Sequence, residues 1–304
     1  ACGILAVLAL AAWSPPGWPR WIVVALAGSV PWLAYLGCLA YVELGMVFFA
    51  AVAGGIVLDC VSADARIGRT EPEAQARVAG AATKGNAREI APPPQTCVTA
   101  GLCAGLAAGC KYTALVLVVV ALATAWLVTM RGALAGRLRC VALFGLGAAI
   151  ALSPWLIRST VFMGNPVYPF AYRWFGGTAW SAEQDAQWAR GHHLPPERDT
   201  LAGRARIAWD ELFTSPMFGP ALFVLAFAGG VAARERAALT AMLWFVFLVV
   251  GWAAWTQMPG RFVLPAAIPL AILGGKAAAA RQRGPRTGEI TAKVASARSR
   301  PWLG

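Results

Sequence analysis

The stretch GLCAGLAAGCKYTALVLVVVALATAWLVTM, from Gly101 to Met130, contains a single charged residue, Lys111. A helix that crosses a bilayer core needs ~20 apolar residues, and the run after this lysine is almost that long. The whole chain has the same character, because 59% of its 304 residues are hydrophobic and only 13% are charged. Soluble domains carry roughly 25% charged residues. The sequence therefore predicts an all-α, polytopic transmembrane protein and excludes an ordinary soluble domain.

Further apolar runs on both sides of this stretch predict about eight or nine spans within one membrane domain, residues 1–276. The chain begins at Ala1, inside an apolar run, so we expect it to be the C-terminal part of a longer protein that has more spans upstream. Residues 60–95 are polar and of mixed charge, and we expect a loop there. The predicted membrane segments are 1–13, 21–40, 44–58, 97–110, 112–130, 140–157, 217–233, 239–255 and 262–275.

Basic residues gather in some of the segments between the apolar runs. Arg131 to Arg139 holds three arginines and no acid, and the chain from Lys276 onward has seven basic residues against one acid. The long segment Arg158 to Pro216 carries six arginines and six acids, so its net charge is zero. Because short basic loops stay cytoplasmic, we expect the loop 60–95 and the basic tail 277–304 to be cytoplasmic, and residues 158–216 to be exoplasmic.

The net charge of +12 does not indicate a nucleic-acid partner, because the excess lies beside apolar runs, where it orients membrane proteins. We predict a multi-pass protein of a bacterial inner membrane with membrane lipids around it. Gly101, Gly105 and Gly109 recur every four residues and would form one bare helix face. Such faces allow close packing of helices in lipid.

Four charged residues are candidates for chemistry at the exoplasmic face. Lys111 lies between two apolar segments, where a charge costs ~3 kcal/mol or more unless it reaches the interface or a partner. Glu43, at the end of a predicted span, is either interfacial, paired with Lys111 or another base, or close to an active-site cavity. Arg158 follows the interfacial pair Pro154-Trp155, and Arg261 precedes the last span. Each arginine is either an interfacial anchor or a phosphate contact, and lysine and arginine are the usual phosphate partners.

The remaining polar residues carry weaker signals. The acids of the long segment, such as Asp210 and Glu211, fit a solvated loop face. His192 and His193 lack the spacing of a metal site, and the seven cysteines form no CxxC motif. The chain has no phosphate-binding loop. We predict no cofactor and leave a divalent metal open.

Four stretches, taken in order, resemble polytopic glycosyltransferases of the GT-C fold. They are AYVELGMVFFAAVAG, GLAAGCKYTALVLVVVALATAWLV, SPWLIRSTVFMGNPVYPFAYRWFGG and GRFVLPAAIPLAILGG. The likeness is to bacterial relatives of the dolichyl-phosphate-mannose protein mannosyltransferases and of the lipid A aminoarabinose transferases, and it covers most of residues 21–276.

The resemblance implies an enzyme that moves a sugar from a polyprenyl-phosphate donor to a glycan, lipid or protein acceptor on the exoplasmic side. The family's main catalytic carboxylate lies in its first exoplasmic loop, which we expect upstream of Ala1. By position in the matching stretches, Lys111, Arg158 and Arg261 would contact the donor phosphate, and Glu43 would line the cavity. A base that takes a proton from the acceptor hydroxyl would contribute ~10²–10⁴-fold.

Two other classes of function remain open at this point. A transporter or lipid-carrier flippase would require two related halves with charged or broken helices at mid-membrane, and the sequence has no matching halves. A lipid-linked oligosaccharide polymerase or ligase would also use exoplasmic arginines on a phosphate, and the sequence separates it poorly from the transferase. A fourth possibility is that the chain as given is incomplete and inactive.

Overall fold

The computed structural model describes residues 2–14, 16–37, 42–78, 92–178, 180–218, 220–232 and 235–282, and every regular element in these ranges is a helix. The all-α prediction is therefore confirmed. Four helical stretches are long and apolar enough to cross a membrane, namely Glu43–Ala63, Leu134–Met163, Arg236–Trp255 and Gly260–Ala279. The chain is thus a membrane protein by helix length and composition, and the expected count of eight or nine spans is not confirmed.

Several expected spans are shorter or divided because prolines and changes of helix type interrupt them. The expected span 21–40 forms two helices, α2 (Trp18–Gly28) and α3 (Pro31–Gly37). Pro31 has no N–H to donate, and its ring disfavours helical backbone in the residue before it. The expected span 112–130 is a π-helix, η1 (Leu115–Val120), followed by α6 (Ala121–Thr129).

Helix α4 (Glu43–Val78) departs from the sequence expectation in the opposite direction. It continues through 36 residues, so the first half of the expected loop 60–95 is helical. The physical reason is that Ala, Arg, Glu and Gln, which are frequent there, favour a helix even where no apolar face is present. The next helix, α5 (Pro94–Cys110), begins at Pro94. Residues 79–91 and the basic tail from residue 283 lie outside the described residues.

The most extensive helix packing in the described part of the chain joins α5 to α7 (Leu134–Met163). A Cβ atom added to Gly101 or Gly105 would collide with the backbone carbonyl oxygen of Phe144 or Ala148. The predicted glycine face is therefore confirmed for these two residues, because only glycine lets the two backbones approach so closely. A Cβ on Gly109 would meet nothing within 4 Å, so this third glycine is not part of the contact.

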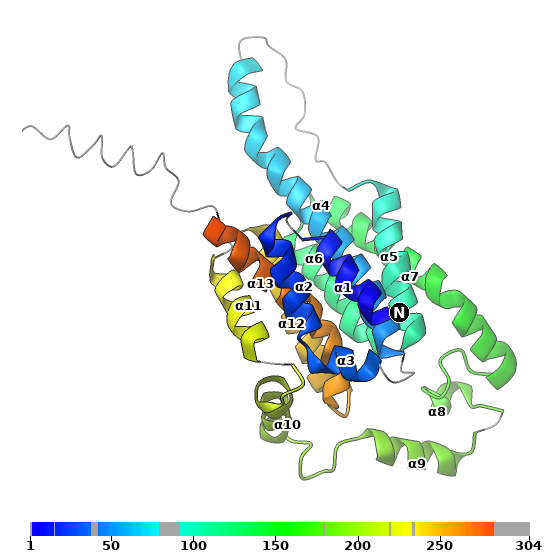
Figure 1. Cartoon of the computed structure of the whole chain (residues 1–304). Helices are drawn as coiled ribbons and strands as arrows, with labels where there is room; N and C mark the ends of the chain where they lie inside the picture. The colour runs from blue at the N-terminus through cyan, green and yellow to red at the C-terminus, as the bar shows by residue number, and fades with distance from the viewer. Residues whose placement is uncertain are drawn as a thin grey trace, which may run out of the picture.

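The remaining elements complete a bundle whose two ends are distinct (Figure 1). Short helices follow α7 at one end of the bundle, and α4 projects from the other end. The core contains the fully buried side chains of Trp126, Trp244, Trp252 and Phe144. The helices not named so far are α1 (Cys2–Ala12), α8 (Tyr172–Phe175), α9 (Ala182–His192), α10 (Leu201–Trp209), η2 (Asp210–Thr214), α11 (Pro220–Ala232), α12 (Arg236–Trp255), η3 (Gly260–Ala266) and α13 (Ala267–Gln282).

We call one end of the bundle the Glu43 end. It holds the start of α4, residue 111, residues 164–178 and 180–216, and the turn between α12 and η3. The opposite end holds the starts of α7 and α12 and the last turns of α13, and we call it the Lys276 end. The sequence predicted that residues 43, 111, 261 and the long polar segment share one side, and the structure places them at one end of the bundle (Figure 1). Which side of the membrane this end faces stays a prediction.

Candidate functional site

A buried carboxylate is the centre of the Glu43 end. The side chain of Glu43 is only 2% exposed, and its Oε1 atom lies 2.6 Å from Nζ of Lys111. The same oxygen lies 3.8 Å from Nε of Arg261. One acid is therefore shared by two cations that come from distant parts of the sequence. We call these three residues the Glu43 cluster.

The ends of three helices bring the Glu43 cluster together. Glu43 is the first residue of α4, where the partial positive charge of a helix N-terminus favours a carboxylate. Lys111 directly follows α5 and has extended backbone, with its amide bonded to the carbonyl of Ala107. Arg261 lies in the first turn of η3. The three charged side chains therefore meet because the ends of three helices lie together at this end of the bundle.

An aromatic ring supports both cations. The Nζ atom of Lys111 lies 3.5 Å from the centroid of the Phe262 ring, and Cζ of Arg261 lies 5.6 Å from it. A cation held over an aromatic face is attracted by the ring quadrupole, by ~2 kcal/mol when it is shielded from water. The ring therefore fixes the cations near the acid.

The Glu43 cluster retains capacity for a further anion or hydroxyl group. One carboxylate and two cations leave a net charge of +1. The side chain of Lys111 is 18% exposed and that of Arg261 is 36% exposed, so both are accessible from outside the bundle. The second oxygen of Glu43, Oε2, is buried and has no hydrogen-bond partner among the residues that the structure describes. Because a buried oxygen without a donor is costly, this atom would be stabilised by a ligand hydroxyl.

Arg158 does not join the Glu43 cluster. It lies on α7, exposed, with its guanidinium 5.2 Å from the Trp155 ring and 5.5 Å from the Phe162 ring. The indole of Trp155 donates a hydrogen bond of 2.5 Å to the Tyr112 hydroxyl, so this part of α7 borders the neighbour of Lys111. Of the three predicted phosphate contacts, the structure brings Lys111 and Arg261 together and leaves Arg158 outside the Glu43 cluster, on the exposed face of α7.

A second carboxylate at this end belongs to Glu211, for which the sequence predicts a solvated loop face. It lies in η2, and its carboxylate rests directly on Gly260, the residue before Arg261. Burial raises the pKa of Glu211, and the neighbouring carboxylate of Asp210 raises it further. No local sequence pattern distinguishes Glu211 from the other acids of the long segment, because its partial burial depends on the distant Gly260.

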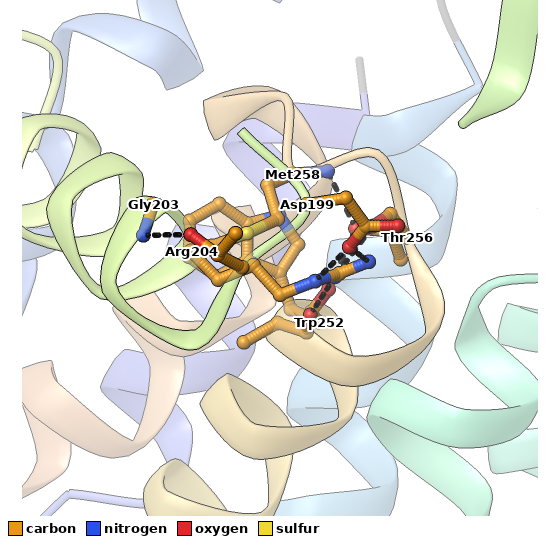
Figure 2. A network of polar contacts seen from close by, with 8 residues as sticks. Asp199, Gly203, Arg204, Trp252, Thr256 and Met258 are labelled. Atoms are coloured by element: carbon orange, nitrogen blue, oxygen red, sulfur yellow. Dashed lines mark hydrogen bonds and ion pairs between the residues drawn. The ribbon is translucent and has the colours of Figure 1, made fainter. Parts of the chain in front are cut away.

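The long polar segment is fixed to the bundle through Arg204 on α10. Its guanidinium forms an ion pair of 2.6 Å with Asp199 and donates hydrogen bonds to the carbonyl oxygens of Ala253 and Thr256, at the end of α12. Figure 2 shows this network, including the hydroxyl of Thr256 that accepts from the amide of Met258. The turn that leads to Gly260 and Arg261 is therefore held by the segment that also carries Glu211.

Within the described residues, no group of three His, Cys, Asp or Glu side chains has the arrangement of a metal site. No protein-family profile, curated protein or solved structure matches this chain.

Proposed function

We propose that this chain is a membrane glycosyltransferase that moves a sugar from a polyprenyl-phosphate donor to an acceptor at the exoplasmic face. The observation that carries the proposal is the Glu43 cluster, in which Lys111 and Arg261 converge on one buried acid at one end of an apolar bundle. The resemblance of four sequence stretches to GT-C glycosyltransferases supplies the reaction class.

The charge of the site supports this class of ligand. A polyprenyl-phosphate sugar is a phosphodiester with one negative charge, and the Glu43 cluster has a net charge of +1. Lysine and arginine side chains donate strong charge-assisted hydrogen bonds to phosphate oxygens. Glu43 would keep the two cations a fixed distance apart in the absence of ligand, so that little reorganisation is needed when the phosphate binds.

The same geometry would also accelerate transfer of the sugar once the donor is bound. When the bond between the sugar and the phosphate breaks, the leaving phosphate gains negative charge. Fixed cations then interact more strongly with the transition state than with the bound donor, and only such a difference accelerates the chemical step. Lys111 and Arg261 would supply this stabilisation without any nucleotide-binding fold.

The lipid part of the donor fits the surroundings of the site. Helix α7 exposes large apolar side chains along its outer face, among them Leu146, Ile150, Ile157 and Val161. Only 28% of its most apolar window is buried inside the bundle, against 72% for Gly260–Ala279. An isoprenoid chain would lie along such a face in the bilayer while its phosphate reaches the end of the bundle.

Binding of the lipid by the two cations is the first test. The full chain in lipid nanodiscs is titrated with labelled polyprenyl phosphate. We expect Lys111→Met or Arg261→Met to weaken binding by about tenfold or more, since a hydrogen bond to a charged group contributes ~1.5–3 kcal/mol. Arg158→Met should have a smaller effect, because this residue lies outside the Glu43 cluster.

Lys276→Met is the matched control, because this lysine is also paired with a glutamate and is 16% exposed. Equal losses of binding for Lys111→Met and Lys276→Met would contradict the proposal. Transfer itself is measured with a polyprenyl-phosphate sugar labelled in the sugar. Movement of the labelled lipid across the bilayer without any release or transfer of the sugar would favour a flippase instead.

A further inference from the structure

Helix α10 and the π-helix η2 that follows it present an apolar stripe to the outside of the bundle. Leu201, Trp209 and Phe213 are 89%, 59% and 46% exposed. Together with Ala205, which is also exposed, they recur every four residues, a spacing that places side chains on one face of a helix. The opposite face contains the buried Leu212 and packs against the core. This element therefore carries apolar side chains on both sides, whereas a helix at a water-covered surface has a polar outer face.

The polar residues beside the apolar stripe leave it uncovered. Arg206 and Asp210 form the neighbouring row on the outside of α10, and their side chains lie 4.0 Å apart. Because one is a cation and the other an anion, this row carries no net charge. It provides polar contacts without selecting an anionic ligand.

The apolar stripe continues onto a helix of the bundle. The centroid of the Phe213 ring lies 4.9 Å from that of Trp209 and 4.7 Å from that of Phe223, which is on α11. Val224 and Phe227 are exposed on the outer face of α11, and this helix contains no charged residue. In a membrane protein such a face lies against acyl chains. The stripe therefore extends a surface that lipid covers.

Helix α10 lies across the end of the bundle rather than along it. Figure 1 views α10 nearly along its axis, beneath α11, whereas α11 and α12 run from one end of the bundle toward the other. An amphipathic helix in the plane of a membrane has this orientation relative to helices that cross the membrane. Arg204 fixes α10 in place through its hydrogen bonds to the carbonyl oxygens of Ala253 and Thr256.

Exposed tryptophans mark the level of the membrane interface. Amphipathic indole rings prefer the headgroup region, where they form belts. Among the described residues, the exposed tryptophans lie at the two ends of the bundle, Trp155, Trp174, Trp209 and Trp255 at the Glu43 end and Trp18 and Trp21 at the Lys276 end. Between the two belts, α7 and α12 expose aliphatic side chains such as Ile150 and Val246. Trp209 thus belongs to the belt at the Glu43 end, and α10 lies at the depth of the headgroups.

We propose that α10 and η2 form an interfacial helix whose apolar stripe is embedded in the phospholipid leaflet at the Glu43 end. The occupant of the stripe is the bilayer itself, at the boundary between headgroups and acyl chains. This inference does not depend on the glycosyltransferase function, because it requires only that the bundle crosses a membrane. It places the Glu43 cluster, which is at the same end of the bundle, close to the level of the headgroups.

Photocrosslinking from single positions tests what covers the stripe. The photoreactive residue p-benzoylphenylalanine takes the place of Trp209 or Phe213 in the full chain, which is illuminated in nanodiscs whose phospholipid is labelled in its acyl chains. We expect labelled protein from both positions, in an amount similar to that from position 227 on the outer face of α11. Position 187, where an exposed glutamine lies on the polar helix α9, should give much less.

Fluorescence quenching provides a second measurement with a conservative variant. Phospholipid brominated near the top of its acyl chains quenches tryptophans that lie in the interface. Trp209→Phe should lose part of the fluorescence intensity that these lipids quench in the wild type. Trp126→Phe, which removes an indole buried in the core, should leave the quenched intensity unchanged.

Two results would overturn the proposal. The first is an absence of lipid crosslinks at positions 209 and 213 while position 227 reacts normally, with equal quenched intensity in Trp209→Phe and the wild type. The second is a crosslink from positions 209 and 213 to another copy of the chain, seen as a band of twice the mass, because it would assign the stripe to an interface between copies.

Discussion

The two ends of the bundle handle charge in different ways. At the Glu43 end, one carboxylate that is 2% exposed serves two cations, Lys111 and Arg261. At the Lys276 end, Lys276 is bound at 3.1 Å by Glu235, whose side chain is 39% exposed. Arginines at that end bind backbone oxygens of helix ends, as Arg236 does with the carbonyl of Thr129 at 2.9 Å.

At the Lys276 end the charged side chains stabilise helix ends, whereas at the Glu43 end they are arranged so that a ligand can bind. Arg236 satisfies a carbonyl that the helix itself leaves without a partner, and Lys276 has its own exposed acid. The Glu43 end concentrates positive charge around a buried acid, which a purely structural arrangement would avoid because buried ions are costly.

The largest loss of folding stability should come from removing the charge of Glu43, the acid that Lys111 and Arg261 share. Glu43→Gln leaves two cations facing each other without their counter-ion, and breaking a buried pair in this way costs about 3–5 kcal/mol. The matched change at the other end, Glu235→Gln, should cost within about 1 kcal/mol, as exposed ion pairs do. Unfolding of both purified variants in detergent, followed by circular dichroism, measures the difference. Similar losses in the two variants would remove the contrast between the ends.

The second largest loss of stability is expected from a change in the contact between α5 and α7. Gly101→Ala forces α5 away from the carbonyl of Phe144, and overpacking of this kind costs about 1–3 kcal/mol. Because Lys111 follows α5, binding of polyprenyl phosphate should weaken in the same variant. Gly109→Ala, which meets no atom within 4 Å, should be neutral or stabilising by up to ~1 kcal/mol. The α5–α7 contact would lose its assigned role if the two variants had equal stability.

A smaller effect is expected where the long segment meets the bundle. Arg204→Ala removes hydrogen bonds to the end of α12, and we expect a local loss of about 1 kcal/mol, at the low end for charged donors because the site is partly exposed. Amide hydrogen exchange should become faster in α10 and in residues 256–260. Arg206→Ala is the control, since that side chain is 86% exposed. Unchanged exchange in Arg204→Ala would show that the segment is held by other contacts.

The smallest change in folding stability is expected from the ionisation of Glu211. Burial raises its pKa, so the folded protein holds this proton more strongly than the unfolded chain does. Stability therefore falls as the pH rises from the ordinary glutamate value of 4.5 through the raised one, and stays lower above it. Glu211→Gln should be more stable than the wild type at neutral pH and equal to it at acidic pH. Melting temperatures across this range measure the effect, and a pH-independent difference would contradict it.

The class of the fold and the grouping of its charged segments follow from the amino-acid sequence alone. Apolar runs interrupted by few charges require helices in a membrane, because a helix satisfies its own backbone hydrogen bonds. The glycine repeat indicated a bare helix face for close packing, and only the structure identified α7 as the partner of Gly101 and Gly105. Candidates such as Glu43, Lys111 and Arg261 stood out because charges beside apolar runs are costly and therefore conspicuous.

The partners of the charged residues became visible only in three dimensions, where the expected count of eight or nine spans is not confirmed. The extension of α4 to Val78 depends on helix propensity, which a search for apolar runs does not reveal. Residues far apart in the chain meet only when helix ends are placed in space, so the sharing of Glu43 by two cations could not be derived from spacing. The contact between Glu211 and Gly260 remained hidden for the same reason, because the sequence places these two residues far apart.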